Sequence, residues 1–283
     1  MATRDHIENP FEYLIQGLSG AFAWTGRPRN PAARVEPRVR RLAAGDVADA
    51  LKMGLTDFGA ARDDVVFIAL IYPLAGLMLA MLAANMALLP MVFPLLSGFA
   101  LLGPLAAVGL YEISRRRESG AQVNWTDAAR VVSSPGIGSI MAMGLIVIAL
   151  FAAWLAASYA LSVAVFANEA PTTVENFLRQ VFATDAGRWM IAIGVGVGFV
   201  FALAAFLISV VSFPLLLDRH VDVDVAIRTS IRVIAENPGV MALWALIVAA
   251  ALVIGSLPAL LGLIVVVPVL GHATWHLYRK AVA

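Results

Sequence analysis

Two histidines, His272 and His276, form the one pair in the sequence whose spacing is typical of a ligand site. They are four positions apart, so an α-helix would place both imidazoles on the same face. Two imidazoles in that arrangement can hold a metal ion or serve a haem group. The two other histidines are far away in the sequence, and the nearby carboxylates are predicted in loops. We therefore predict that the pair packs and hydrogen-bonds between helices, without metal or cofactor; a cofactor site is the alternative.

Other kinds of chemistry find little support in the sequence. The chain has no cysteine, which excludes disulfides, iron–sulfur clusters and thiolate chemistry. The long apolar stretches carry almost no ionisable residues, whereas proton-coupled pumps and transporters need them along the path. Glu112 stands at the end of one stretch beside three arginines, where we expect a solvated ion pair. No pattern of Ser, His and Asp indicates a nucleophile, so we predict that the protein is not an enzyme.

The elements that must position these residues are long apolar helices. Of 283 residues, 61% are hydrophobic and 14% charged, which is more apolar surface than a soluble domain of this size can bury. A helix of about 20 apolar residues crosses a hydrocarbon core of about 30 Å. The predicted spans are residues 64–86, 91–113, 137–159, 189–217, 240–257 and 259–278. The sequence thus predicts an all-α bundle of six transmembrane helices.

These spans are also predicted to form three related units. Shifting residues 258–280 back by 164 positions aligns them with residues 94–116. An offset of 176 aligns residues 222–231 with residues 46–55. Each unit is therefore predicted as a surface helix followed by a helical hairpin, with the middle unit keeping the Ser/Asn-Pro-Gly sequence that begins a span. The apolar face of the first surface helix, 46–61, is predicted to contain Val47, Ala50, Leu51, Leu55 and Phe58.

Residues 1–41 are predicted to be separate from the membrane domain of residues 42–283. They begin with a short amphipathic helix and continue as a tether rich in Arg and Pro. The apolar face of that helix contains Phe11, Leu14, Ile15, Leu18 and Phe22. We expect this face to lie on lipid headgroups or on the bundle, and the alternative is docking to a partner protein.

The distribution of basic residues predicts the orientation. All but two of the 20 Lys and Arg fall on one side of the predicted spans. By the positive-inside rule, both termini are then cytoplasmic. No basic face of a soluble domain is evident, so we expect no nucleic-acid partner.

A run of alternating glycines predicts close contact between helices. Gly194 and Gly198 lie four apart within the fourth predicted span, a spacing that lets two helix backbones approach. The run lies inside a span and has no lysine, so it is not a phosphate-binding loop. These two glycines and the N-terminal amphipathic helix are the predicted partner contacts.

Four segments of the chain resemble a family of bacterial predicted integral membrane proteins, domain of unknown function 2189. They are residues 98–120 (GFALLGPLAAVGLYEISRRRESG), 212–222 (SFPLLLDRHVD), 229–238 (TSIRVIAENP) and 269–279 (VLGHATWHLYR). The resemblance extends from about Arg38 to the C-terminus and implies a membrane protein of the bacterial inner membrane without a defined activity. Similar proteins are often labelled cytochrome c oxidase subunit I, but six predicted spans and four histidines cannot supply that subunit's haem and copper ligands.

The sequence and the resemblance together predict a non-catalytic accessory or structural subunit of a larger membrane complex, with a respiratory cytochrome oxidase as the expected assembly. The alternative is a channel or carrier for a small uncharged or zwitterionic solute. Its substrate would be held near Pro104 and Pro268, where the spans lose backbone hydrogen bonds.

Overall fold

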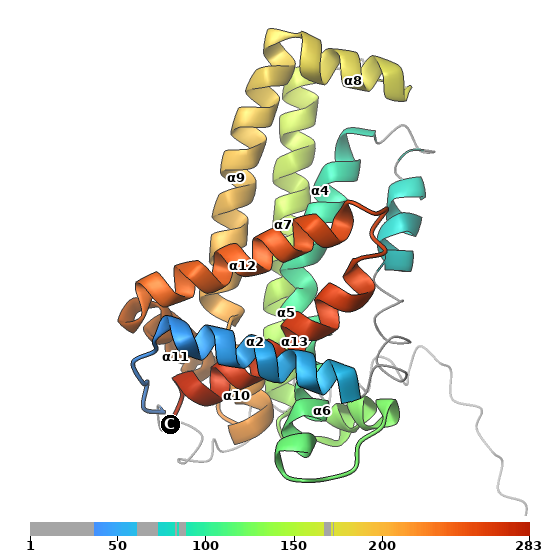
Figure 1. The fold of residues 1–283 in the computed structure, drawn as a ribbon. Coiled ribbons are helices and arrows are strands. Elements are labelled where there is room, and N and C mark those ends of the chain that lie inside the picture. Colours follow the sequence, from blue (N-terminus) through green and yellow to red (C-terminus); the bar gives the residue numbers. More distant parts are fainter. Residues whose placement is uncertain (1–36, 61–72, 83, 85–88, 167–170, 172) are drawn as a thin grey trace, which may run out of the picture.

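The protein consists mainly of helices in the part of the chain that its structure, a computed structural model, describes (Figure 1). The described residues are 37–60, 73–82, 84, 89–166, 171 and 173–283. The predicted all-α fold class is confirmed over these ranges. The predicted amphipathic helix at residues 11–24 lies outside them, as does about half of the first predicted span.

Four helices or runs of helices in the described ranges are long and apolar enough to cross a membrane. They are Leu89–Glu118, Ile137–Phe166, Asp185–Arg219 and Pro238–Ser256. They correspond to the second, third, fourth and fifth predicted spans. Of the first predicted span, the structure describes the short apolar helix Pro73–Leu82. Six spans are therefore not confirmed.

Two of these four runs are divided. The first consists of α4 (Leu89–Phe99), the 3-10 helix η3 (Ala100–Leu102), α5 (Gly103–Ala106) and α6 (Val108–Glu118). Pro104 in the first turn of α5 has no backbone N–H, so α-helical hydrogen bonding cannot continue through it. The third run consists of α9 (Asp185–Ser209) and α10 (Ser212–Arg219). The other two are the single helices α7 (Ile137–Phe166) and α12 (Pro238–Ser256).

The sixth predicted span, 259–278, is not among the four. Its helix, α13, begins only at Leu263, after a turn in which Ala259 and Leu260 have positive φ angles of 50° and 68°. The second half of α13 is buried among protein, against α2 (Ala44–Ala60) and α6, and carries both histidines. Protein neighbours can form hydrogen bonds with these polar side chains, whereas lipid cannot. The sixth span was predicted from its apolar length alone, and it is not confirmed.

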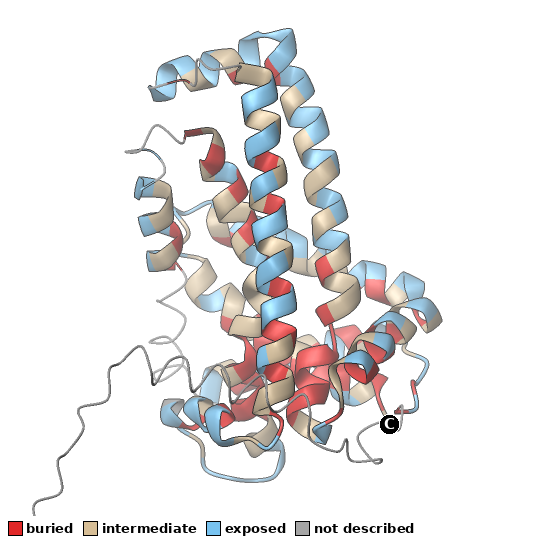
Figure 2. Cartoon of the chain, turned by 180° about the vertical axis from the view of Figure 1, so that it is seen from behind, coloured by how far each residue is buried: buried red, intermediate tan, exposed pale blue. Residues whose placement is uncertain are grey.

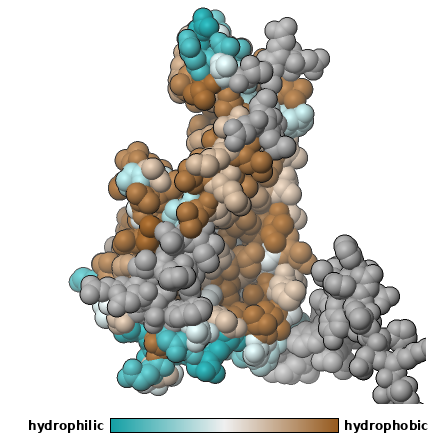
Figure 3. All heavy atoms as spheres, turned by 90° about the vertical axis from the view of Figure 1, so that its right-hand side faces the viewer, coloured by the Kyte–Doolittle hydropathy of each residue, from teal (hydrophilic) through white to brown (hydrophobic). Residues whose placement is uncertain are grey.

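Shorter helices form a polar body at one end of the long helices. They are α2, η4 (Trp125–Ser133), α10 and α11 (Val223–Glu236). Buried residues gather at this end, whereas few residues of α7 and α9 beyond it are buried (Figure 2). Large aromatic side chains fill the body, including Trp244, Trp275, Tyr111 and Tyr278. In the space-filling view, a hydrophobic band lies between two hydrophilic ends, as a membrane would require (Figure 3).

The surface helices pack on the long helices in a cyclic order. Helix η4 packs on α6, α11 packs on α9 and α10, and α2 packs on α13. Each surface helix thus contacts the end of the hairpin that precedes it, and the first contacts the end of the last. This is the order that three related units would adopt around a common axis, and the repeat itself stays a prediction.

The helix predicted at 46–61 is confirmed as α2, but its buried face differs from the predicted one. Val47 and Ala50 are buried as predicted, and they are joined by Gly54 and Asp57. Leu55 is 55% exposed. Gly54 lies on the buried face because α2 crosses α13 at this position, and the crossing leaves no room for a side chain.

The connection between α7 and α9 contains a helix that the sequence reading treated as a loop. Helix α8 (Val174–Ala183) lies across the far ends of α7 and α9, opposite the polar body (Figure 1). It begins at Thr173, whose hydroxyl accepts a hydrogen bond from the Asn176 backbone N–H at 3.2 Å.

Candidate functional site

The candidate site is a buried polar cluster where α2, α6 and α13 meet. Gly54 makes it possible, because a Cβ atom at this position would lie 2.7 Å from the Ala273 backbone nitrogen and 2.8 Å from the Val269 carbonyl oxygen. Only glycine allows the two helices to approach so closely. One turn later, Asp57 faces the same side of α2 and reaches the histidines of α13.

Asp57 is the centre of this cluster. Its Oδ2 atom accepts a hydrogen bond from Ser114 Oγ at 2.6 Å and lies 2.8 Å from His276 Nε2. Its Oδ1 atom lies 3.0 Å from Arg117 Nε. Asp57 is 6% exposed, so a single buried carboxylate joins α2 to both α6 and α13.

His272 completes the cluster from the other side of Ser114. Its Nδ1 atom lies 2.7 Å from Ser114 Oγ, and the residue is fully buried. Because the Ser114 hydroxyl donates to Asp57, its oxygen is free to accept a hydrogen bond from the Nδ1–H of His272. The Nε2 atom then carries a lone pair, and it has no hydrogen-bond partner in the described structure.

Burial and hydrogen bonding set the ionisation of the cluster. Burial acts to raise the pKa of the Asp57 carboxyl, but hydrogen bonds from His276 and Ser114 outweigh it, and the pKa lies below its ordinary value. Burial lowers the pKa of His272, which lies in α13 outside the four helices long and apolar enough to cross a membrane, to about 4. At neutral pH the cluster therefore contains a carboxylate and a neutral His272.

The same contacts show what the cluster can do chemically. A catalytic Ser and His pair requires a histidine nitrogen that accepts the serine proton, with the serine open to substrate. Here the Ser114 hydroxyl donates its hydrogen bond to Asp57, and its side chain is fully buried. The geometry is that of a lock between helices and not of an activated nucleophile.

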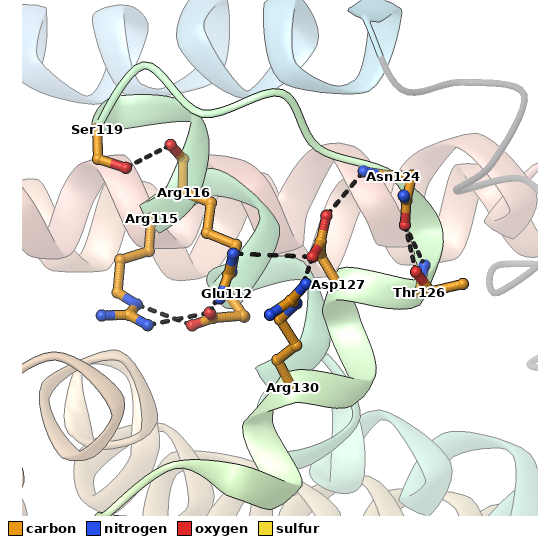
Figure 4. A network of polar contacts seen from close by, with 8 residues as sticks. All are labelled: Glu112, Arg115, Arg116, Ser119, Asn124, Thr126, Asp127 and Arg130. Atoms are coloured by element: carbon orange, nitrogen blue, oxygen red, sulfur yellow. Dashed lines mark hydrogen bonds and ion pairs between the residues drawn. The ribbon is translucent and has the colours of Figure 1, made fainter.

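A second network lies beside the first and involves Glu112 (Figure 4). Its carboxylate accepts hydrogen bonds from Arg115 at 2.8 and 2.9 Å and from Arg116 at 2.7 Å. Arg116 also lies 3.7 Å from Asp127 of η4, which in turn pairs with Arg130 at 2.6 Å. The expected solvated ion pair at Glu112 is wrong in one respect, because Glu112 is only 1% exposed. Helix η4 packs on α6 and covers this end of it, so the Glu112 carboxylate contacts its arginines and is shielded from water.

A third set of contacts ties α13 to α6 and α10. Glu118 accepts hydrogen bonds from Trp275 Nε1 at 3.1 Å and from Arg279 Nε at 3.0 Å. The Tyr278 hydroxyl donates to Asp218 of α10 at 2.6 Å. The polar half of α13 is thus held on several sides by charged partners.

The segment that precedes α2 is held to the same body. Val39 forms an isolated antiparallel bridge with Val282, and the Arg40 N–H donates to the Ala281 carbonyl at 2.8 Å. Asn237 Oδ1 accepts from the Leu42 N–H at 2.6 Å. Residues 37–60 therefore form a strap, and α2 is its helical part.

The structure brings together the two histidines that the sequence singled out, His272 and His276, and adds Asp57 and Ser114, which the sequence reading missed. One signal could have found Asp57. It follows Val47, Ala50 and Gly54 at helical spacing, so it belongs to a buried stripe of α2 despite its charge. Ser114 offered no comparable signal.

The predicted partner-contact glycines lie against α7 of the same chain. A Cβ atom at Gly194 would be 3.5 Å from Leu161 Cδ2, and one at Gly198 would be 3.1 Å from Trp154 Cη2. Between them, Gly196 points elsewhere, with nothing within 4 Å of its Cβ position. Contact of Gly194 or Gly198 with a partner stays a prediction.

The two histidines do not fit the cofactor alternative as they stand. One nitrogen of each already faces the Asp57 and Ser114 cluster, and the free nitrogen of His272 is buried. In the described residues, no group of three or more His, Asp or Glu side chains has the geometry to hold a metal ion.

Comparison with known proteins supports the resemblance that the motifs indicated. No curated protein and no solved structure matches the chain. Residues 92–218 match the model of a family described as "Predicted integral membrane protein (DUF2189)". The matched range contains Ser114 and Arg117, whereas Asp57 and both histidines lie outside it. Over residues 92–218, the resemblance of this chain to the DUF2189 integral membrane proteins is confirmed.

Proposed function

We propose that this protein is a non-catalytic accessory or structural subunit of a larger membrane complex. The proposal rests on the outward face of α9, which is the face opposite Gly194 and Gly198. Only 6% of the apolar window of the run that contains α9 is buried within the chain, against 33% for the run that contains α4 and α6. A partner helix on this face would cover it.

The outward face of α9 has the shape that a partner helix needs. Gly196 leaves a notch in the helix surface, and the larger side chains around it are exposed: Phe199 is 66%, Val200 63% and Leu203 43% exposed. In lipid, helices associate through close packing, which small residues between larger ones make possible. This face lies opposite Gly194 and Gly198, so α7 and a partner could contact α9 together.

The buried cluster supports a structural role for the rest of the molecule. Its carboxylate and hydroxyl are used to lock the strap and α13 to α6, and Ser114 is closed to substrate. We further propose that the assembly is a respiratory cytochrome oxidase in a bacterial inner membrane, as the resemblance implies. Both termini would be cytoplasmic, because nearly all basic residues gather at one side of the apolar helices.

Affinity purification of the tagged full-length chain in a mild detergent tests this function. We expect a stoichiometric membrane partner, and an oxidase partner would bring haem absorbance. Gly196→Ile fills the notch and should reduce the yield of the partner. Ala250→Ile is the matched control, since it enlarges an exposed small residue of α12.

A protein that purifies alone, or a partner that Gly196→Ile and Ala250→Ile release equally, contradicts the proposal. A flux assay separates it from the carrier alternative. Vesicles that contain the purified protein should take up a small zwitterionic solute no faster than empty vesicles.

A further inference from the structure

Helix α8 is held at a sharp corner with α9. The Thr184 hydroxyl accepts a hydrogen bond from the Gly187 N–H at 3.0 Å and thereby caps α9. A Cβ atom at Gly187 would overlap the carbonyl oxygens of Gln180 and Val181, so the corner requires glycine. The orientation of α8 across the ends of α7 and α9 is therefore fixed by backbone contacts (Figure 1).

The ten residues of α8 have one apolar side and one polar side. On the apolar side, Val181 is buried and Phe177 packs on Phe166 at the end of α7, with ring centroids 6.2 Å apart. Three further apolar residues continue this side and are uncovered: Val174 is 58%, Leu178 47% and Phe182 65% exposed. They are spaced by four, so they form a single stripe beside the residues that contact the chain's own helices.

The position of α8 indicates what covers this stripe. Helix α7 has 30 residues, or about 45 Å at 1.5 Å per residue, which exceeds a hydrocarbon core of about 30 Å. The helix is therefore long enough for its far end to reach the headgroups. Tyr159 and Trp189 are exposed near this end, at 55% and 68%, as is typical of residues at the membrane–water boundary.

We propose that α8 lies in the membrane interface, with Val174, Leu178 and Phe182 in contact with lipid acyl chains. The polar side, with Glu175, Asn176 and Arg179, faces water. The occupant is lipid because the stripe continues the apolar surface of α7 and α9 at the depth where acyl chains meet headgroups. The apolar side of such a helix is buried by about 5–10 Å in that boundary.

The absence of cysteine from the chain makes the test direct. Leu178→Cys and Asn176→Cys each introduce one labelling site, on opposite sides of α8, and both residues are exposed, so folding is retained. Each full-length variant is labelled with a polarity-sensitive fluorophore. It is then placed in vesicles of phosphatidylethanolamine and phosphatidylglycerol.

Two quenchers then locate each label: a nitroxide on the lipid acyl chain near the headgroup, and iodide on both sides of the membrane. We expect the label at position 178 to be quenched by the lipid nitroxide and shielded from iodide, and the label at position 176 to show the reverse. Equal iodide quenching at both positions overturns the proposal. Shielding of position 178 from both quenchers also overturns it, because a protein and not lipid would then cover the stripe.

Discussion

Asp57→Ala should weaken the attachment of the strap to α13. The substitution removes the only acceptor that Ser114 Oγ and His276 Nε2 share, and it leaves both groups buried. A hydrogen bond to a charged group contributes about 1.5–3 kcal/mol, so two of them correspond to about 3–6 kcal/mol. Arg117 Nε lies 3.0 Å from Asp57 Oδ1 but makes no hydrogen bond in the described structure, so this contact is left out of the sum.

The free energy of unfolding, measured by denaturant titration of the purified protein in detergent, should fall by about 3–5 kcal/mol, the range typical when one partner of a buried charge pair is removed. Limited proteolysis within residues 37–60 should become faster, because the strap is held to α13 at this point. Asp57→Asn keeps the size of the side chain and one acceptor, so it should cost less than Asp57→Ala.

Asp49→Ala is the matched control. Asp49 also lies on α2 and pairs with a residue of α13, Lys280, at 3.1 Å, but its side chain is 57% exposed. Exposed pairs contribute about 0–1 kcal/mol. If Asp57→Ala and Asp49→Ala changed stability by the same amount, or if the strap stayed protected in Asp57→Ala, the inferred lock would be refuted.

Three further predictions concern the same body. Gly54→Ala forces α2 away from α13 and should cost about 1–3 kcal/mol in the same titration, whereas Gly45→Ala meets no atom within 4 Å and should not destabilise. Because the pKa of Asp57 is lowered in the folded protein, its contribution is present above the ordinary carboxyl pKa of about 4 and is lost as pH falls below it. Stability measured against pH should therefore fall more steeply in acid for the wild type than for Asp57→Asn. Glu112→Gln removes the buried charge between two arginines and should lower the melting temperature, with the Glu118→Gln variant, whose side chain is 37% exposed, showing a smaller change.

The sequence predicted the helical class and the four long apolar helices because apolar length is a local property. The sixth predicted span, which includes α13, is not confirmed, and the environment of His272 and His276 is created by α2, which is distant in the sequence. Composition shows that the first half of α13 is apolar, but not that its second half is enclosed by protein. Helix α8 was missed because ten residues give a short apolar pattern, although Val174, Leu178 and Phe182 have the spacing of a helix face.

The candidate site was predictable only in part for the same reason. The spacing of His272 and His276 indicated one helix face, whereas Asp57 and Ser114 come from two other helices. Whether the unpaired Nε2 atom of His272 carries a lone pair depends on which group donates to Ser114, and no sequence pattern encodes that choice.

The crossing of α2 and α13 also has a consequence for biosynthesis. Asp57 and His276 are 219 positions apart, and ribosomes add roughly 5–20 residues per second. Asp57 is therefore synthesised on the order of 10–40 s before His276, while all the intervening helices are made and inserted. During that interval the nascent α2 is a vulnerable element, open to proteases and chaperones, and synthesis of α13 ends that exposure.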